Sequence, residues 1–262
     1  MGGFRVALQS RLNGVYARSV YLPVSTLGQH LRRISRRLRG VTRGHATALP
    51  VVPWQDVLAS KPVSIVAPRK NSGDVNLAEL AVLGSAAAAV AAGSEIIEIG
   101  TFDGRTTLNF AVNAPAQLQV FTLDLPPDLP PRFGLAPGEL AFVDKPRSGR
   151  HFAAPKPEFA AAAARITQLL GDSATYDWSA HFGRAGLVFV DGSHAYDYVI
   201  ADSDTAFRLV ANKGMVIWHD YGVWEGVTRA LEQLEASRHL GLRHVRGTSL
   251  VVWQAGDLQR GR

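Results

Sequence analysis

The chain has 262 residues, of which 47% are apolar and 19% are charged. This is enough chain for one hydrophobic core of about 200 residues and an appendage. Cysteine is absent, which excludes a disulfide framework, a thiolate metal site and a cysteine nucleophile. The lack of cysteine also fits a reducing compartment, so we expect a cytoplasmic protein. No apolar run reaches the roughly 18 residues that a membrane-spanning helix requires.

The net charge of +6 is unevenly distributed along the chain. Residues 1–50 contain nine Arg and neither Asp nor Glu, so the other 212 residues carry 19 basic and 22 acidic side chains, a net charge of −3. The body of the protein is therefore mildly acidic. It shows no pattern typical of nucleic-acid binding, and we expect no nucleic-acid partner.

Residues 1–70 are predicted to be a basic N-terminal arm followed by a proline-containing connector. Leu27, Leu31, Ile34 and Leu38 follow helical spacing, with arginines largely around the other side, which indicates a basic amphipathic helix. Three roles remain open for it. The first role is a peripheral contact on an anionic membrane surface, and the second is a targeting segment. The third is a solvated arm or a contact within a homo-oligomer.

The remainder, 71–262, is predicted to be a single domain in which strands and helices alternate. Helices are expected over 76–92, 106–112, 196–210 and 227–237, and strands over 95–100, 118–124, 166–170, 187–191, 215–220, 242–246 and 248–254. Such alternation predicts an α/β fold. We expect a Rossmann-like, doubly wound, mostly parallel seven-stranded sheet that closes with a C-terminal antiparallel hairpin.

Polar residues end five of the predicted strands. They are Gly100, Asp124, Asp172, Asp191 and Asp220. In open parallel sheets, ligands bind beyond the carboxyl ends of the strands, so these residues predict a ligand crevice. Asp and Gly also favour turns, which leaves turn formation as the alternative for any single one of them.

The loop after the first of these strands reads from Glu98 to Thr107. Gly100 permits a sharp turn and a close approach to a ligand, and Gly104 lets the next helix begin near that ligand. Phe102 stands where the dinucleotide motif requires a glycine, and no Gly-Lys-Ser/Thr follows. The spacing favours a ligand with an adenosine end and no pyrophosphate.

These segments together resemble the class I S-adenosylmethionine-dependent methyltransferases over residues 71–254. The resemblance rests on residues 98–104, Asp124, the turn at 171–173, residues 190–194 and residues 218–220. The most similar branch includes macrolide sugar O-methyltransferases and cephalosporin-hydroxylase-like proteins, in which Asp-Gly-Ser-His follows the fourth strand.

The resemblance implies that the cofactor is S-adenosylmethionine. Gly100 and its neighbours would pass the methionine part, with Glu98 supporting the amino group. Asp124 would accept hydrogen bonds from both ribose hydroxyls, which suits a carboxylate, and Asp172 and Ser173 would flank the adenine. The full set of expected cofactor-binding residues is Glu98, Gly100, Thr101, Phe102, Gly104, Thr106, Asp124, Asp172, Ser173 and Asp191.

Methyl transfer from a sulfonium releases a neutral leaving group, so the enzyme must chiefly align the acceptor with the methyl group. A hydroxyl acceptor also needs a base to take its proton. His194, three residues after Asp191, is the candidate base, and the resemblance implies the same role. The alternative is that His194 merely caps the following helix.

A divalent metal is the second open question about this site. Asp191 and Asp220 end neighbouring strands and could hold Mg²⁺ or a similar cation through oxygen ligands. The metal-using relatives carry an acidic residue where this chain has His219. Imidazole favours Zn²⁺ or Mn²⁺, so His219 is either a third ligand, beside Asp191 and Asp220, or a second acid–base group.

Residues 126–157, here called the lid segment, are rich in proline and predicted to be irregular. We interpret the segment as a substrate-gating loop above the cofactor, with disorder as the alternative.

The main hypothesis is an O-methyltransferase that acts on a small hydroxylated acceptor such as a sugar, a glycolipid or a natural product. One alternative is a nicotinamide-dependent oxidoreductase, against which Phe102 argues. The other is a membrane-associated binding protein with a vestigial cofactor fold, against which the intact set of acidic strand ends argues.

Overall fold

A computed structural model describes residues 47–68, 75–139 and 148–256. The arginine-rich helix expected near residues 27–38 lies outside the described residues, as do 69–74, 140–147 and 257–262. Within the part of the chain that is described, no helix is both long and apolar enough to cross a bilayer.

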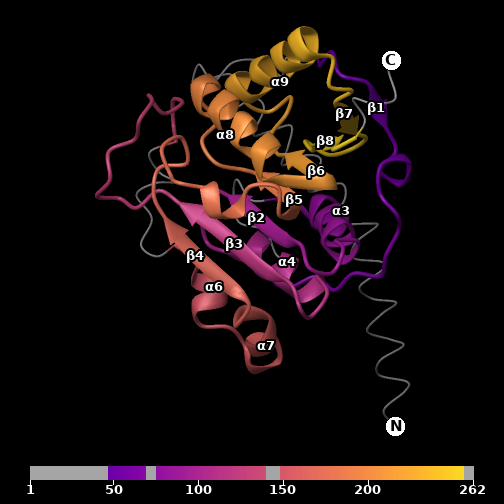
Figure 1. Cartoon of the computed structure of the whole chain (residues 1–262), viewed down its shortest axis with the longest axis vertical. Coiled ribbons are helices and arrows are strands. Elements are labelled where there is room, and N and C mark those ends of the chain that lie inside the picture. The colour runs from indigo at the N-terminus through magenta and orange to yellow at the C-terminus, as the bar shows by residue number, and fades with distance from the viewer. Residues whose placement is uncertain (1–46, 69–74, 140–147, 257–262) are drawn as a thin grey trace, which may run out of the picture. The chain divides into compact units, whose positions relative to one another are not determined.

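A sheet of eight strands forms the centre of the body (Figure 1), and its order is β1-β7-β8-β6-β5-β2-β3-β4. The strands are β1 (Val51–Val52), β2 (Glu95–Ile99), β3 (Gln119–Asp124), β4 (Ile166–Leu170), β5 (Ala185–Val190), β6 (Val210–Trp218), β7 (Arg243–Val245) and β8 (Val251–Gln254). Strand β8 runs antiparallel to β6 and β7, and the other neighbouring strands are parallel. The Rossmann-like α/β fold and the closing antiparallel hairpin are thus confirmed.

The predicted count of seven strands is wrong, because the described residues form eight. The extra strand is β1, which lies in the segment that the sequence indicated to be a connector. Val51 and Val52 pair in parallel with His244 and Val245 of β7. Two residues are too few to show any alternation of apolar and polar positions, so the sequence pattern could not reveal this strand.

Helices cover both faces of the sheet (Figure 1). The long helices are α3 (Leu77–Ala88), α4 (Arg105–Asn113), α8 (Tyr196–Leu209) and α9 (Glu225–Arg238), and two four-residue helices are α6 (Arg150–Ala153) and α7 (Ala160–Ala163). Helices α3 and α4 pack on one face, and α8 and α9 pack on the other. This arrangement is the doubly wound one that the sequence predicted.

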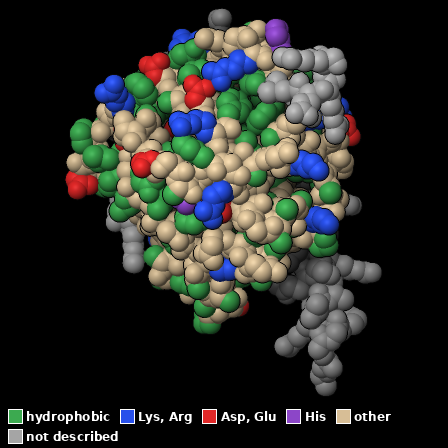
Figure 2. Space-filling view, in the orientation of Figure 1, with side chains coloured by type: hydrophobic (Ala, Val, Ile, Leu, Met, Phe, Trp, Pro, Cys, Tyr) green, Lys and Arg blue, Asp and Glu red, His purple; other side chains and the backbone are tan. Residues whose placement is uncertain are grey.

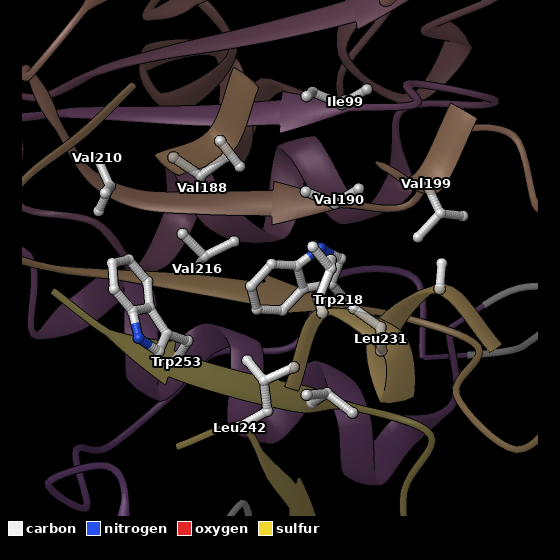
Figure 3. Close-up of a cluster of buried hydrophobic side chains, with 14 of the residues drawn as sticks. Ile99, Val188, Val190, Val199, Val210, Val216, Trp218, Leu231, Leu242 and Trp253 are labelled. Atoms are coloured by element: carbon white, nitrogen blue, oxygen red, sulfur yellow. The ribbon is translucent and has the colours of Figure 1, made fainter. Parts of the chain in front are cut away.

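Alternation along the buried strands divides the core into two layers. In β5, Leu187 and Phe189 pack toward α3 and α4, whereas Val188 and Val190 pack toward α8 and α9. Figure 3 shows the second layer, where Trp218 lies beside these valines. Because successive side chains of a strand point to opposite faces, strands covered on both sides must be apolar throughout.

On the face of the described residues that Figure 2 shows, charged side chains are spread out rather than gathered. Figure 2 shows the Lys and Arg side chains of the described residues scattered over the visible face, separated by side chains of other kinds. This face of the described residues therefore carries no continuous basic patch.

The loop after β2 leaves no room for a side chain at Gly100. Its φ is +103°, and a Cβ built there would lie 2.0 Å from the backbone oxygen of Asp191. The loops after β2 and β5 are therefore in backbone contact at this point.

We expect Gly100→Ala to lower the free energy of unfolding by about 3 kcal/mol or more, since a backbone clash adds to the strain of a positive φ. Gly93→Ala is the matched control, because Gly93 has a φ of +83° but nothing within 4 Å of its added Cβ. The control should lose only about 1 kcal/mol. Urea unfolding of both variants measures the difference, and equal losses would contradict the packing argument.

Candidate active site

The loop after β2 is held against β3 by its own backbone. The N–H groups of Gly100 and Thr101 donate to the carbonyl of Leu123 at 2.9 and 3.2 Å. Thr101 Oγ1 lies 2.7 Å from Thr122 Oγ1. Phe102 has a φ of +48°, so the loop reverses direction through a left-handed residue before α4 begins.

Glu98 lies beneath this loop and is buried. The hydroxyl groups of Thr107 and Thr122 both donate to its Oε2. Burial is the main cause that raises the pKa of Glu98 to about 8, and the nearby carboxylates of Asp191 and Asp124 contribute to this rise, while the two hydrogen bonds oppose it. Its expected contact with the cofactor amino group remains a prediction.

Asp124 ends β3 and is 7% exposed. The hydroxyl of Ser148, in the lid segment, donates a hydrogen bond to Asp124 Oδ2. The amide of Gln168 in turn donates to Ser148 Oγ at 2.6 Å. A hydroxyl group of the chain therefore contacts the carboxylate that was predicted to bind the ribose hydroxyls.

Asp172 follows β4 and also contacts the lid segment. The backbone N–H of Arg132 donates to its Oδ2 at 2.5 Å, and the hydroxyl of Tyr198 donates to the same oxygen at 2.7 Å. The ring of Phe133 packs edge-on against Tyr198, with 5.3 Å between the centroids. Ser173 and Thr106, two other predicted cofactor residues, are half-buried.

His194 lies between two carboxylates. Its Nδ1 is 2.5 Å from Glu139 Oε1, and its Nε2 is 2.8 Å from Asp220 Oδ2. The indole of Trp224 stacks on the imidazole at 4.3 Å between centroids and 12° between planes. Burial would lower the pKa of His194, but the hydrogen bonds to Asp220 and Glu139 outweigh it and raise the pKa to about 9.

Glu139 belongs to the lid segment and is only 3% exposed. Besides the imidazole, its carboxylate accepts the backbone N–H of His194, and it accepts the hydroxyl of Ser193 at 2.8 Å. Desolvation of Glu139 works against its ionised form, but these bonds and the nearby imidazole prevail and lower its pKa. Glu139 thus joins the lid segment to the loop that carries the candidate base.

His219 is held by carboxylates on both ring nitrogens. Its Nδ1 lies 3.0 Å from Asp191 Oδ1 and 3.6 Å from Asp220 Oδ2, and its Nε2 lies 3.2 Å from Glu79 Oε2. Burial opposes the charged imidazole, but these carboxylates raise the pKa of His219 well above its usual value. Burial likewise opposes ionisation of Asp220, but His219 and His194 lower its pKa.

The backbone at Asp220 is left-handed, with a φ of +65°. This is an uncommon conformation for a residue other than glycine. The N–H of Asp220 donates to Ser249 Oγ at 3.2 Å, and the N–H of Tyr221 donates to the carbonyl of Ser249 at 3.0 Å. The segment before β8 therefore supports the turn that directs the Asp220 carboxylate toward the two histidines.

The structure brings the predicted catalytic and metal residues together. Asp191, His219 and Asp220 each offer one ligand atom, and these three atoms lie within 4.8 Å of one another. The atoms are two carboxylate oxygens and one imidazole nitrogen, a set that Mn²⁺ or Zn²⁺ accepts. The residues present therefore fit a divalent cation.

Sequence reasoning missed four residues of this site: Glu79, Glu139, Ser148 and Ser249. One sequence pattern involves Glu79, because Asn76 and Glu79 have the spacing of a helix-capping box. That pattern predicts the start of a helix and does not predict a functional site. The contacts of Glu79 with His219 and Ser249 span 140 and 170 residues of sequence. No local pattern could connect them.

Comparison with known proteins shows a similarity to one family over the region of the strand ends. The family profile described as "Methyltransferase domain" matches residues 97–221, which contain the loop after β2 and every strand end discussed above. The match spans just under half of the chain, and over these residues the chain is similar to the methyltransferase family. A comparison with curated protein sequences gives no match.

Solved methyltransferase structures are similar to this chain. The O-methyltransferase NovP superposes with a TM-score of 0.50 and is 15% identical, covering 69% of this chain and 80% of its own. The O-methyltransferase TomG from Streptomyces achromogenes, solved with S-adenosylmethionine, has a TM-score of 0.47 and is 18% identical, covering 70% of this chain and 82% of its own. The calicheamicin methyltransferase CalS11 has a TM-score of 0.48 and is 18% identical, covering 68% and 77%.

Proposed function

We propose that this protein is a methyltransferase, which transfers the methyl group of S-adenosylmethionine to a hydroxyl of a small acceptor, such as a sugar, a glycolipid or a natural product. The observation that carries the proposal is the position of His194. Its imidazole lies at the edge where the strands end, 2.8 Å from Asp220 and stacked on Trp224. A fixed imidazole near the cofactor loop suits removal of a proton from a hydroxyl group.

The contacts of His194 define how it can act. Asp220 holds Nε2, so Nδ1 is the nitrogen that would take a proton from the acceptor. Because the raised pKa keeps the imidazole charged at neutral pH, Nδ1 must first give up its own proton, for which the Glu139 carboxylate is the neighbouring acceptor. Glu139 Oε1 lies 2.5 Å from that nitrogen. The acceptor hydroxyl therefore has to replace Glu139 at Nδ1, and this exchange also removes one of the two carboxylates that raise the pKa of His194.

The cofactor is proposed to lie along the loop after β2. Asp124 takes the ribose hydroxyls, and Asp172 and Ser173 flank the adenine. Two of these groups now contact the lid segment, through Ser148 and through the backbone of Arg132. Cofactor binding is therefore expected to compete with lid contacts at both carboxylates.

The metal remains part of the proposal. Asp191, His219 and Asp220 would hold the cation, with Mn²⁺ or Zn²⁺ favoured over Mg²⁺ by the imidazole. A bound divalent cation would lower the pKa of a coordinated hydroxyl and orient it. Apart from that, proton removal is assigned to His194 and alignment of the acceptor to the surrounding side chains.

A thermal-shift experiment separates this function from the oxidoreductase alternative. S-adenosylhomocysteine at about 100 times its dissociation constant should stabilise the protein by about 2.7 kcal/mol, which raises the melting temperature by a few degrees. NAD at the same concentration should leave the melting temperature unchanged, because Phe102 stands in place of the glycine needed near a pyrophosphate. A shift with NAD alone would overturn the proposed function.

A further inference from the structure

Glu79 is a buried carboxylate from the start of α3, far in sequence from the strand ends that it contacts. It is 3% exposed. Its Oε1 accepts the N–H of Ser249 at 2.8 Å and the hydroxyl of the same residue at 2.9 Å. Its Oε2 accepts the N–H of Asn76 at 2.8 Å and faces His219 Nε2 at 3.2 Å. Both oxygens are thus directed at hydrogen-bond donors.

These contacts fix the orientation of His219. The two N–H groups and the hydroxyl that donate to Glu79 favour a carboxylate, which can only accept, so the proton of the facing imidazole belongs on Nε2. Nδ1 is then the nitrogen that faces Asp191 and Asp220. A metal-binding histidine typically donates its other ring N–H to a carboxylate in this way.

The Glu79 carboxylate also supports Asp220, through Ser249. Ser249 donates its hydroxyl proton to Glu79, so its oxygen is free to accept the N–H of Asp220 at 3.2 Å. That bond supports the left-handed turn at Asp220, where φ is +65°. Glu79 therefore contacts one candidate ligand directly and another through a single serine.

We propose that Glu79 is the positioning residue of the metal centre: it holds His219 with Nδ1 toward Asp191 and Asp220, and through Ser249 it holds the backbone of Asp220. The inference rests on the metal centre of the proposed function. It accounts for the orientation of His219 among the candidate ligands, since a buried carboxylate holds its Nε2.

Calorimetric titration of the full-length chain with Mn²⁺, and separately with Zn²⁺, tests the proposal. Glu79→Gln has the same shape, but its NH₂ group must face either the donors of Ser249 or those of Asn76 and His219. We expect it to bind metal 10- to 100-fold more weakly than the wild type. Ser249→Ala removes only the link to Asp220 and should lose less affinity; wild-type affinity in this variant would overturn that link.

Asn76→Ala is the matched control for a purely structural role. It removes the side-chain cap of α3 but keeps the backbone N–H that donates to Glu79. It should lower the melting temperature and leave metal affinity within about threefold of the wild type. If Asn76→Ala weakens metal binding as much as Glu79→Gln, Glu79 acts only by capping the helix and the proposal is wrong.

NMR of ¹⁵N-labelled protein with Zn²⁺ shows which ring nitrogen of His219 binds the metal. A purely structural role of Glu79 would not determine this choice of nitrogen. The ¹⁵N shifts of His219 should identify Nδ1 as the ligating nitrogen, with the proton on Nε2, and ligation through Nε2 would overturn the proposal. S-adenosylhomocysteine binding is measured in the same samples. Wild-type protein that binds S-adenosylhomocysteine but neither metal overturns this inference alone, whereas loss of S-adenosylhomocysteine binding overturns the proposed function.

Discussion

Replacing Asp124 with alanine should weaken the binding of S-adenosylmethionine and S-adenosylhomocysteine by at least about 100-fold. Hydrogen bonds to a charged group contribute about 1.5–3 kcal/mol each, and Asp124 is proposed to accept one from each ribose hydroxyl. The side chain stands at the end of β3 and is 7% exposed, so water cannot easily replace it. Calorimetric titration with S-adenosylhomocysteine measures the loss.

Two controls separate the ribose contact from other effects of this change. Asp128→Ala removes an exposed carboxylate of the lid segment, four residues further on, and should bind like the wild type. Ser148→Ala removes the lid hydroxyl that contacts Asp124 but keeps the carboxylate. Because it removes a competitor of the ribose, it should bind at least as tightly as the wild type. A loss below about fivefold in a folded Asp124→Ala protein would refute the ribose assignment.

The strand ends were predictable because they depend on local patterns. Continuous apolar segments mark the buried parallel strands, and an acidic residue or a glycine directly after each one predicts the edge where ligands bind. Asp191 and Asp220 could therefore be placed together from the sequence alone. In the structure they end up around the same imidazole, that of His219.

The rest of the site depends on contacts between distant segments. Glu139 lies in an irregular, proline-rich segment, where no periodicity shows which side chains turn inward. Its contact with His194 spans 55 residues and depends on how the lid segment packs over the loop after β5. The sequence identified His194 as a candidate base, but it could not show that both ring nitrogens face carboxylates.

Replacing His194 with alanine should lower turnover by about 10²–10⁴-fold, the usual contribution of a general base. Binding of S-adenosylhomocysteine should stay within about threefold of the wild type, because the side chain lies between Glu139 and Asp220 and against Trp224, which are not residues assigned to the ribose or the adenine. Turnover is measured as S-adenosylhomocysteine release, with an acceptor selected by the wild type from a panel of glycosides and phenols.

His239→Asn is the control for this change, because it removes an exposed histidine beyond the end of α9 and asparagine tolerates the φ of +50° found there. It should retain full turnover. Equal losses of turnover and cofactor binding in His194→Ala would mean that His194 supports the loop and does not take the proton. Retained turnover would leave proton removal to another group, and His219, held between Asp191 and Glu79, would be the next residue to replace.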